Sequence, residues 1–221
     1  MKKLIALSLL IILVCSTFVG CDWKSIFQKD KDDDSQKIKY SEGLEFMLSN
    51  DGESYWLKGI GSCTDTKIVI PNTYNNLPVT YIYEEAFINQ TSIVSIIMPD
   101  SIVGIGFRAF QNCTSLNNVV MGKSVEYITD WAFAGCSSLK KITIPRSTIY
   151  IYWNAFAGCT SLQKIIFEDP SNWGYGEMQY DAIYDLYRWV VIPIEEDLSN
   201  PEIAAQLLTS TYVDDMLQKT E

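Results

Sequence analysis

A repeat of 23 residues is the feature of this sequence that most restricts its fold. Ala-Phe pairs recur four times at this spacing: Ala86-Phe87, Ala109-Phe110, Ala132-Phe133 and Ala155-Phe156. Other apolar columns share the same period and phase: Ile82, Ile105, Ile128, Ile151; Cys113, Cys136, Cys159; Leu116, Leu139, Leu162. A unit of this length cannot bury its own apolar face, so successive units must stack around a continuous core.

Each unit predicts short strands and no long helix. Residues 139–145 read LKKITIP, an alternation that predicts a strand with Ile142 and Ile144 facing inward and Thr143 facing outward. Ile128 and its equivalents predict a second short strand, and the remaining residues are too few for a helix of any length. The sequence therefore predicts a mainly β solenoid of 23-residue rungs.

The unit at 131–145, WAFAGCSSLKKITIP, resembles the BspA-type leucine-rich repeat, and the likeness extends over Tyr81 to Phe167. Departures are local: Asn89-Gln90 replaces Gly-Cys, and Gly122 replaces a proline. The resemblance implies a surface or secreted bacterial protein that binds other proteins or host matrix. It implies no enzymatic activity and no cofactor.

The segments on either side of the repeats, 81–167, are predicted to be caps, because an open solenoid end exposes an unpaired strand edge. Residues 43–80 form the N-terminal unit, with a hairpin of Leu44–Leu48 and Ser54–Ile60 around the turn Asn50-Asp51-Gly52. Residues 168–221 form the C-terminal unit. Its predicted helix begins at Pro201 after Ser199 or Asn200, with apolar residues at helical spacing: Ile203, Leu207, Met216, Leu217.

The first 20 residues have the charged, apolar and small-residue order of a signal peptide. They end in Phe-Val-Gly before Cys21, which resembles a bacterial lipobox and implies lipidation of Cys21. Cys15 follows a valine and fits that pattern less well. Residues 21–42 then predict a flexible polar tether rather than a calcium loop, since Ser35 and Ser41 stand where an EF-hand needs Gly and Glu. We therefore expect an extracytoplasmic protein that is anchored to the membrane by lipid and exposed at the cell surface.

The chain contains no histidine and has a formal net charge of −10. Without imidazole it has no Ser-His-Asp or Cys-His catalytic unit and no His-ligated zinc or haem. The acidic balance argues against nucleic acid as a partner. The acidity belongs to the last 54 residues, which hold twelve acidic and two basic side chains. Two carboxylates of a hydrolase in this part stay an open alternative.

Two motifs of the chain are expected to be structural. Cys63, Cys113, Cys136 and Cys159 are predicted to be free buried thiols, because equivalent positions direct their Cβ atoms in parallel. Residues 104–109, GIGFRA, match the dinucleotide-binding pattern GxGxxA but lie inside a rung rather than between a strand and a long helix. We expect no cofactor and no metal.

A column of aromatic residues is the candidate binding site. Tyr81, Gly104, Tyr127 and Tyr150 share one repeat position, and further aromatic residues follow them. The site residues predicted from this pattern are Tyr127, Trp131, Tyr150, Tyr152 and Trp153. Such rings provide rigid contact area for proteins or sugars, although a column that only shields the rung edges would look the same. A second outward column, Ile97, Val120, Thr143 and Ile166, indicates a sticky face or merely good strand formers.

The sequence as a whole favours a non-enzymatic adhesion or binding module, monomeric and lipid-anchored, that recognises a protein or host-matrix ligand along the solenoid. A carbohydrate-binding surface lipoprotein that uses the aromatic column is one alternative. An accessory subunit of an envelope complex is another.

Overall fold

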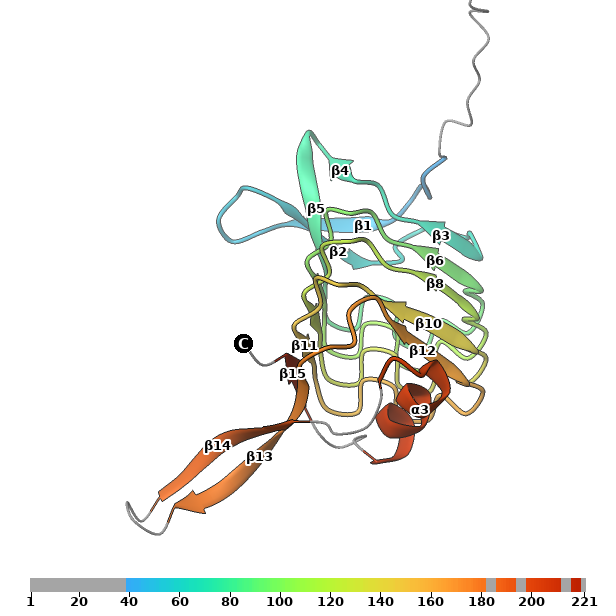
Figure 1. Ribbon diagram of the computed structural model, residues 1–221. Helices are drawn as coiled ribbons and strands as arrows, with labels where there is room; N and C mark the ends of the chain where they lie inside the picture. The colour runs from blue at the N-terminus through green and yellow to red at the C-terminus, as the bar shows by residue number, and fades with distance from the viewer. Residues whose placement is uncertain (1–38, 182–185, 194–197, 212–215, 220–221) are drawn as a thin grey trace, which may run out of the picture. The chain divides into compact units, whose positions relative to one another are not determined.

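The computed structural model describes residues 39–181, 186–193, 198–211 and 216–219, and Lys39–Glu221 forms one compact unit. This unit is mainly β: a solenoid of about five turns spaced roughly 23 residues apart, with one short helix near the C-terminus (Figure 1). The predicted fold class is confirmed. Within the described residues, no helix has both the length and the apolar character needed to span a bilayer.

One side of the rungs is a continuous sheet, here called the long sheet. Its strands follow the order β1 (Glu45–Leu48), β2 (Tyr55–Gly59), β5 (Leu77–Ile82), β7 (Gly104–Ile105), β9 (Tyr127–Ile128), β11 (Tyr150–Ile151), β15 (Leu217–Lys219), β13 (Trp173–Asp181), β14 (Leu186–Pro193). From β2 to β11 the neighbours are parallel. Register places equivalent repeat positions side by side, so Tyr81 pairs with Gly104, Gly104 with Tyr127, and Tyr127 with Tyr150.

The opposite side is built from strands of three or four residues in two groups, here called the split sheet. One group is β3 (Lys67–Val69), β6 (Ser95–Ile97) and β8 (Asn118–Val120), and the other is β10 (Lys141–Ile144) and β12 (Lys164–Phe167). All pairs within each group are parallel. The labelled arrows of β3, β6, β8, β10 and β12 follow one another down one side of the unit in Figure 1.

Stacked phenylalanines fill the space between the two sheets. The rings of Phe87, Phe110, Phe133 and Phe156 lie nearly parallel, with centroids 5.1, 5.1 and 5.6 Å apart, and each is at most 1% exposed. This spacing follows from the rung separation of about 4.8 Å that strand pairing imposes. The repeated isoleucine, cysteine and leucine columns are buried around the rings.

Two turn residues in each of four rungs adopt the left-handed backbone conformation, four positions apart. The first of each pair is Glu85, Arg108, Trp131 or Asn154, and the second is Asn89, Asn112, Gly135 or Gly158. Glycine and asparagine tolerate this conformation best, which explains why Asn89 can replace the glycine of later rungs. The Asn112 side-chain amide also donates to the Asn89 side-chain oxygen at 3.0 Å.

The split sheet divides between β8 and β10. The amides of Val94, Asn117 and Gln163 each donate to a carbonyl of the preceding rung, whereas the equivalent amide of Lys140 has no such bond in the described part of the chain. Gly122, which follows β8, lies close to the previous rung on the other side, so that an added Cβ would lie 2.0 Å from the Pro99 carbonyl oxygen.

The N-terminal end is closed by the predicted hairpin. β1 and β2 pair antiparallel, and β2 continues the long sheet by pairing with β5. The Ser49 hydroxyl contacts Asp51 and Ser54 at the turn, which fixes its geometry. A second ribbon pairs β4 (Thr73–Tyr74) antiparallel with β5.

The C-terminal end differs in part from its prediction. The helix α3 (Pro201–Gln206) begins as predicted, with Asn200 as its N-cap and Pro201 in the first turn, but a π-helical turn (Leu207–Thr211) follows and ends it. Leu217 was expected on this helix and lies instead in β15, which pairs antiparallel with β11 and β13. Leu217 lies in a strand despite the helical spacing, because the strand pairs with the backbone N–H and C=O groups at the exposed edge of the last rung.

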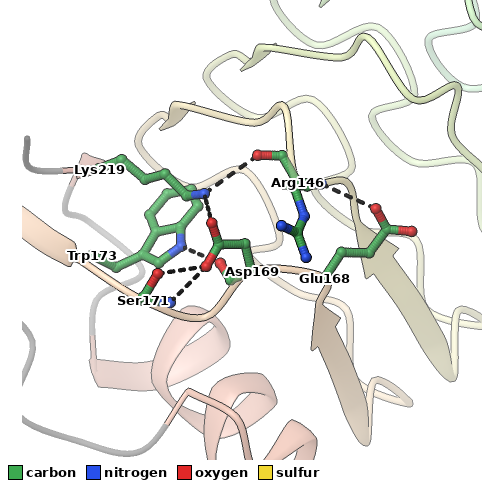
Figure 2. Close-up of polar contacts among 6 residues, drawn as sticks. All are labelled: Arg146, Glu168, Asp169, Ser171, Trp173 and Lys219. Atoms are coloured by element: carbon green, nitrogen blue, oxygen red, sulfur yellow. Dashed lines mark hydrogen bonds and ion pairs between the residues drawn. The ribbon is translucent and has the colours of Figure 1, made fainter.

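A polar cluster fastens β15 to the last rung (Figure 2). The Lys219 ammonium lies 2.9 Å from Asp169 and donates to the Arg146 carbonyl at 3.3 Å. Asp169 also accepts from the backbone and hydroxyl of Ser171, and its own carbonyl accepts from the Trp173 indole at 3.1 Å. The Ser171 and Lys219 hydrogen bonds hold the pKa of Asp169 well below its ordinary value. This clasp gives the short terminal strand contacts beyond its backbone pairing.

All four cysteines of the described residues are buried free thiols. Three of them form a ladder in which each Sγ–H donates to a phenylalanine carbonyl: Cys113 to Phe87 (3.1 Å), Cys136 to Phe110 (3.2 Å) and Cys159 to Phe133 (3.2 Å). Burial raises the pKa of both Cys113 and Cys159 to about 12, and it raises that of Cys136 as well.

Candidate functional site

Four of the five predicted site residues form one contiguous series on the long sheet, here called the aromatic strip. Tyr127 and Tyr150 stack with centroids 5.7 Å apart and planes 7° apart. Tyr150 then contacts Tyr152 at 5.8 Å, and Tyr152 contacts Trp153 edge-on at 6.1 Å. The tyrosines are half-buried and Trp153 is 39% exposed, so the strip presents ring surface to solvent while its inner edges pack on the rungs.

Trp131, the fifth predicted residue, stands apart from the strip. It occupies the left-handed turn position that follows β9, and its amide donates to the Trp153 carbonyl at 3.0 Å. No ring contact joins Trp131 to the strip among the residues described. A tryptophan in this conformation is uncommon, and the repeat itself imposes it, since the equivalent positions are left-handed too.

Aromatic surface continues toward the N-terminal cap beyond the predicted residues. Trp56 on β2 stacks on Tyr83 with centroids 5.8 Å apart and contacts Tyr81 at 5.9 Å. Sequence reasoning missed Trp56 because it lies in the cap, outside the phase of the repeat. It also missed Phe107, which is 36% exposed and could have been found, because it stands two repeats before Trp153.

A depression of about 600 Å³ lies between these rings. Its lining consists of Trp56, Thr80, Tyr81, Tyr83, Glu84, Val103, Phe107, Thr129 and Asp130. Two glycines of the second rung lie beside it, at positions where other rungs carry Tyr or Thr. The Tyr81 ring covers Gly104 so closely that a Cβ there would lie 2.3 Å from it, and a Cβ on Gly106 would lie 2.6 Å from the Ile82 carbonyl. The GxGxxA pattern is therefore a packing requirement of the rungs.

Carboxylates accompany the rings along this face. Glu84, Phe107, Asp130 and Trp153 occupy one repeat position in successive rungs. Burial raises the pKa of Asp130, although its own amide and that of Trp153 donate to the carboxylate and oppose the rise. Burial, followed by the charge of Glu84, raises the pKa of Tyr81. These shifts indicate a face that is electronegative and partly desolvated.

The phenols of the aromatic strip share this electronegative environment. The charge of Glu126 raises the pKa of Tyr127. Burial, and then the neighbouring tyrosines and Asp130, raise the pKa of Tyr152. Tyr127 and Tyr152 therefore offer ring surface and hydroxyl groups rather than phenolates.

The second outward column, on the split sheet, is less continuous. Ile97 and Val120 are 41% and 45% exposed, whereas Thr143 and Ile166 are half-buried. The division between β8 and β10 separates these two pairs. This face offers scattered apolar contacts and no stacked rings.

The remaining predicted sites lie at the two ends of the chain. Cys21 and the lipobox lie outside the described residues, as does the proposed tether up to residue 38. In the acidic C-terminal part, the described carboxylates are engaged structurally: Asp169 binds Lys219, and Glu202 lies 3.5 Å from Lys164. Glu168 accepts from the Arg146 amide at 3.1 Å (Figure 2).

Known proteins resemble the repeats. The BspA type leucine rich repeat region matches six copies over residues 61–178. A leucine-rich repeat protein from Bacteroides capillosus shares 32% identity over 57% of this chain and 95% of its own, with a TM-score of 0.51. A leucine-rich repeat protein of T. pallidum shares 27% identity over 58% of this chain and 64% of its own, with a TM-score of 0.53. No curated protein sequence matches the chain significantly.

The matched residues include every rung of the solenoid and extend to the first strand of the C-terminal unit. Proteins with such repeats are typically found at bacterial surfaces and are generally non-enzymatic binding modules. The repeat period, the stacked fold and this match together place the chain in the BspA-type leucine-rich repeat family.

Proposed function

We propose that this protein is a lipid-anchored module of the bacterial cell surface that binds a protein ligand along the aromatic strip. The observation that carries the proposal is the strip itself: Tyr127, Tyr150, Tyr152 and Trp153 form an unbroken series of partly exposed rings across two rungs. The core does not require these rings, because the stacked phenylalanines already fill it.

Aromatic surface of this kind suits recognition of proteins. Tyrosine and tryptophan bury large areas at little cost in side-chain entropy and dominate the binding energy of interfaces. Successive rungs repeat the contact at the rung spacing of about 4.8 Å, so a partner that lies along the strip gains several contacts at once. The rings are also already ordered by their mutual stacking, which lowers the entropy lost on binding.

A sugar ligand is the second candidate, and the parallel Tyr127–Tyr150 pair favours it. These two rings are stacked with planes 7° apart, and such an ordered pair offers rigid aromatic surface against which a sugar ring can pack. The accessory-subunit alternative would use the same surface against a permanent envelope partner. Both alternatives make the strip the contact site, so they differ from the main proposal in the ligand alone.

The proposal is tested by applying the detergent-solubilised full chain to arrays of proteins and of glycans. We expect retention of a protein ligand and loss of at least tenfold in affinity when Tyr150→Ala and Trp153→Ala are combined. The matched control combines Ile97→Ala and Val120→Ala, which removes exposed apolar side chains from the split sheet, and it should bind within twofold of wild type. Equal loss in both variants, or retention of glycans alone, would contradict a protein-binding strip.

Anchoring through Cys21 is tested separately. Metabolic labelling with an alkyne-bearing fatty acid should label the wild-type protein and leave Cys21→Ser unlabelled. Cys15→Ser is the control and should be labelled like the wild type. Label that persists in Cys21→Ser would refute the proposed lipidation site.

A further inference from the structure

The charged side chains that line the depression beside the strip are both acidic. Its ionisable lining residues are the carboxylates of Glu84 and Asp130 and the phenols of Tyr81 and Tyr83, and neither lysine nor arginine lines it. Phe107 stands between the two acids in their shared repeat column, so an aromatic ring is flanked by a carboxylate on each side. The rings of Trp56, Tyr81 and Tyr83 complete the lining toward the N-terminal cap.

We infer that this depression receives the guanidinium group of an arginine side chain displayed by the protein ligand. The inference deepens the proposed function and rests on it. Aromatic faces attract cations through their quadrupole, and carboxylates add opposite charge at the same place. Guanidinium fits better than ammonium because it is planar, stacks on rings, is weakly hydrated and binds carboxylates with two parallel hydrogen bonds.

The chain contains its own example of the contact, just outside the depression. The Arg108 guanidinium carbon lies 4.6 Å from the centroid of the Phe107 ring, and Nη1 lies 3.7 Å from Glu85 Oε1. One guanidinium is thus already held by a ring of this column together with a carboxylate. Arg108 does not line the depression, and its ion pair is with Glu85 rather than with either lining acid.

The burial of Asp130 gives an incoming cation a further advantage. A carboxylate that has lost part of its hydration gains more from an opposite charge than one fully in water. Because that burial raises the pKa of Asp130, protonation of Asp130 should weaken binding as pH falls. The volume of about 600 Å³ leaves room for groups that flank the arginine in the partner.

The test titrates the full-length protein with Nα-acetyl-arginine N-methylamide. The readout is the indole N–H resonance of Trp56, assigned by its absence in Trp56→Phe. We expect saturable shifts with a Kd on the order of 1 mM, about 4 kcal/mol of binding free energy. The citrulline analogue has nearly the same shape without the charge, and we expect it to bind at least tenfold more weakly.

Charge variants separate the depression from the general acidity of the chain. Asp130→Asn combined with Glu84→Gln should weaken arginine binding at least tenfold. The matched control, Glu42→Gln with Asp65→Asn, removes the same charge from exposed positions away from the depression and should stay within twofold. A small change in thermal midpoint for both pairs verifies that the fold is intact.

Three results would overturn the inference: citrulline binding equal to arginine, an unchanged affinity in the Asp130→Asn, Glu84→Gln pair, or tighter binding of choline than of the arginine probe. The last would reassign the depression to a quaternary ammonium headgroup. The probe titration needs no protein partner. Failure of the inference is therefore seen in the titration, whereas failure of the proposed function is seen when the arrays retain no protein.

Discussion

Alkaline pH should destabilise this protein through its thiol ladder. In the unfolded chain a cysteine ionises with a pKa near 9.0, whereas Cys113 and Cys159 in the folded state have a pKa of about 12. Between these values the folded state holds protons that the unfolded state releases, so the free energy of unfolding falls as pH rises. Below pH 9 the contribution of both thiols is fully present.

The expected magnitude follows from the two pKa values. Raising the pH to 10 costs about 1–2 kcal/mol for each thiol, or about 3 kcal/mol for Cys113 and Cys159 together. For a unit of this size that corresponds to a fall of roughly 6–12 °C in thermal midpoint. Cys136 acts in the same direction. The raised pKa values of Tyr81, Tyr127 and Tyr152 add to the alkaline loss, so wild type alone cannot isolate the thiols.

Cysteine variants isolate the thiol contribution. Urea unfolding of wild type and of Cys113→Ala with Cys159→Ala, under reducing conditions at pH 8, 9 and 10, gives the loss of free energy with pH for each. The variant starts less stable, because buried atoms are removed, but should lose about 3 kcal/mol less between pH 8 and 10. Ile105→Val removes buried atoms without a titrating group and should parallel wild type. An equal alkaline loss in wild type and cysteine variant would refute the reasoning.

Three further predictions concern the split, the closely packed rung and the C-terminal clasp. In hydrogen exchange, the Lys140 amide should exchange at least tenfold faster than those of Asn117 and Gln163, whose equivalent bonds to the preceding rung are made; similar protection at all three would mean that β8 and β10 are paired in solution. Gly122→Ala should lower the free energy of unfolding by about 1–3 kcal/mol in urea titrations, because its Cβ would meet the Pro99 carbonyl, and Gly59→Ala, whose Cβ would lie 3.3 Å from its nearest neighbour, should cost less. Asp169→Asn should lower the thermal midpoint at pH 7, and its difference from wild type should shrink progressively as pH falls below 3.8, because the lowered pKa of Asp169 gives its full stabilisation only above the ordinary value. A difference at pH 2 as large as that at pH 7 would disprove a charge-based clasp.

Most of this fold can be predicted from the sequence because residues one repeat apart in the chain are also neighbours in space. Once the Ala-Phe pairs give the period of 23, residues one period apart must be neighbours, so the pairing of Tyr127 with Tyr150 and the stacking of Phe110 on Phe133 follow directly. Each rung repeats the same side-chain directions, and an error in one would conflict with the others. This redundancy is the physical reason that the fold class and most of the strip were predictable.

The parts that departed from prediction lie where the repeat stops or changes by one residue. Trp56 joins the aromatic surface through the register of β2 with β5, which no period determines. Leu217 fits a helical spacing in the sequence, yet an unpaired strand edge on β11 accepts it as a strand. Gly122 departs from the proline of other rungs, and its close approach to Pro99, which accompanies the break in the split sheet, is set by backbone packing that the composition of the rung does not reveal.

The side chains of the aromatic strip can be changed without loss of the fold, because different residues of each rung form the core and the outer surface. In one rung, Ile128 and Phe133 are buried and support the stack, while Tyr127 and Asp130 face the outer surface of the long sheet. Size is restricted at the outward position of Gly104, whose hydrogen leaves room for the Tyr81 ring. Gly104→Ala should therefore displace Tyr81 and change the depression while the buried columns stay in place. We expect it to lose more binding free energy for arginine than free energy of unfolding. If Gly104→Ala instead lowers the free energy of unfolding strongly while its folded form binds arginine like wild type, the glycine is needed for the packing of the rungs and not for the depression.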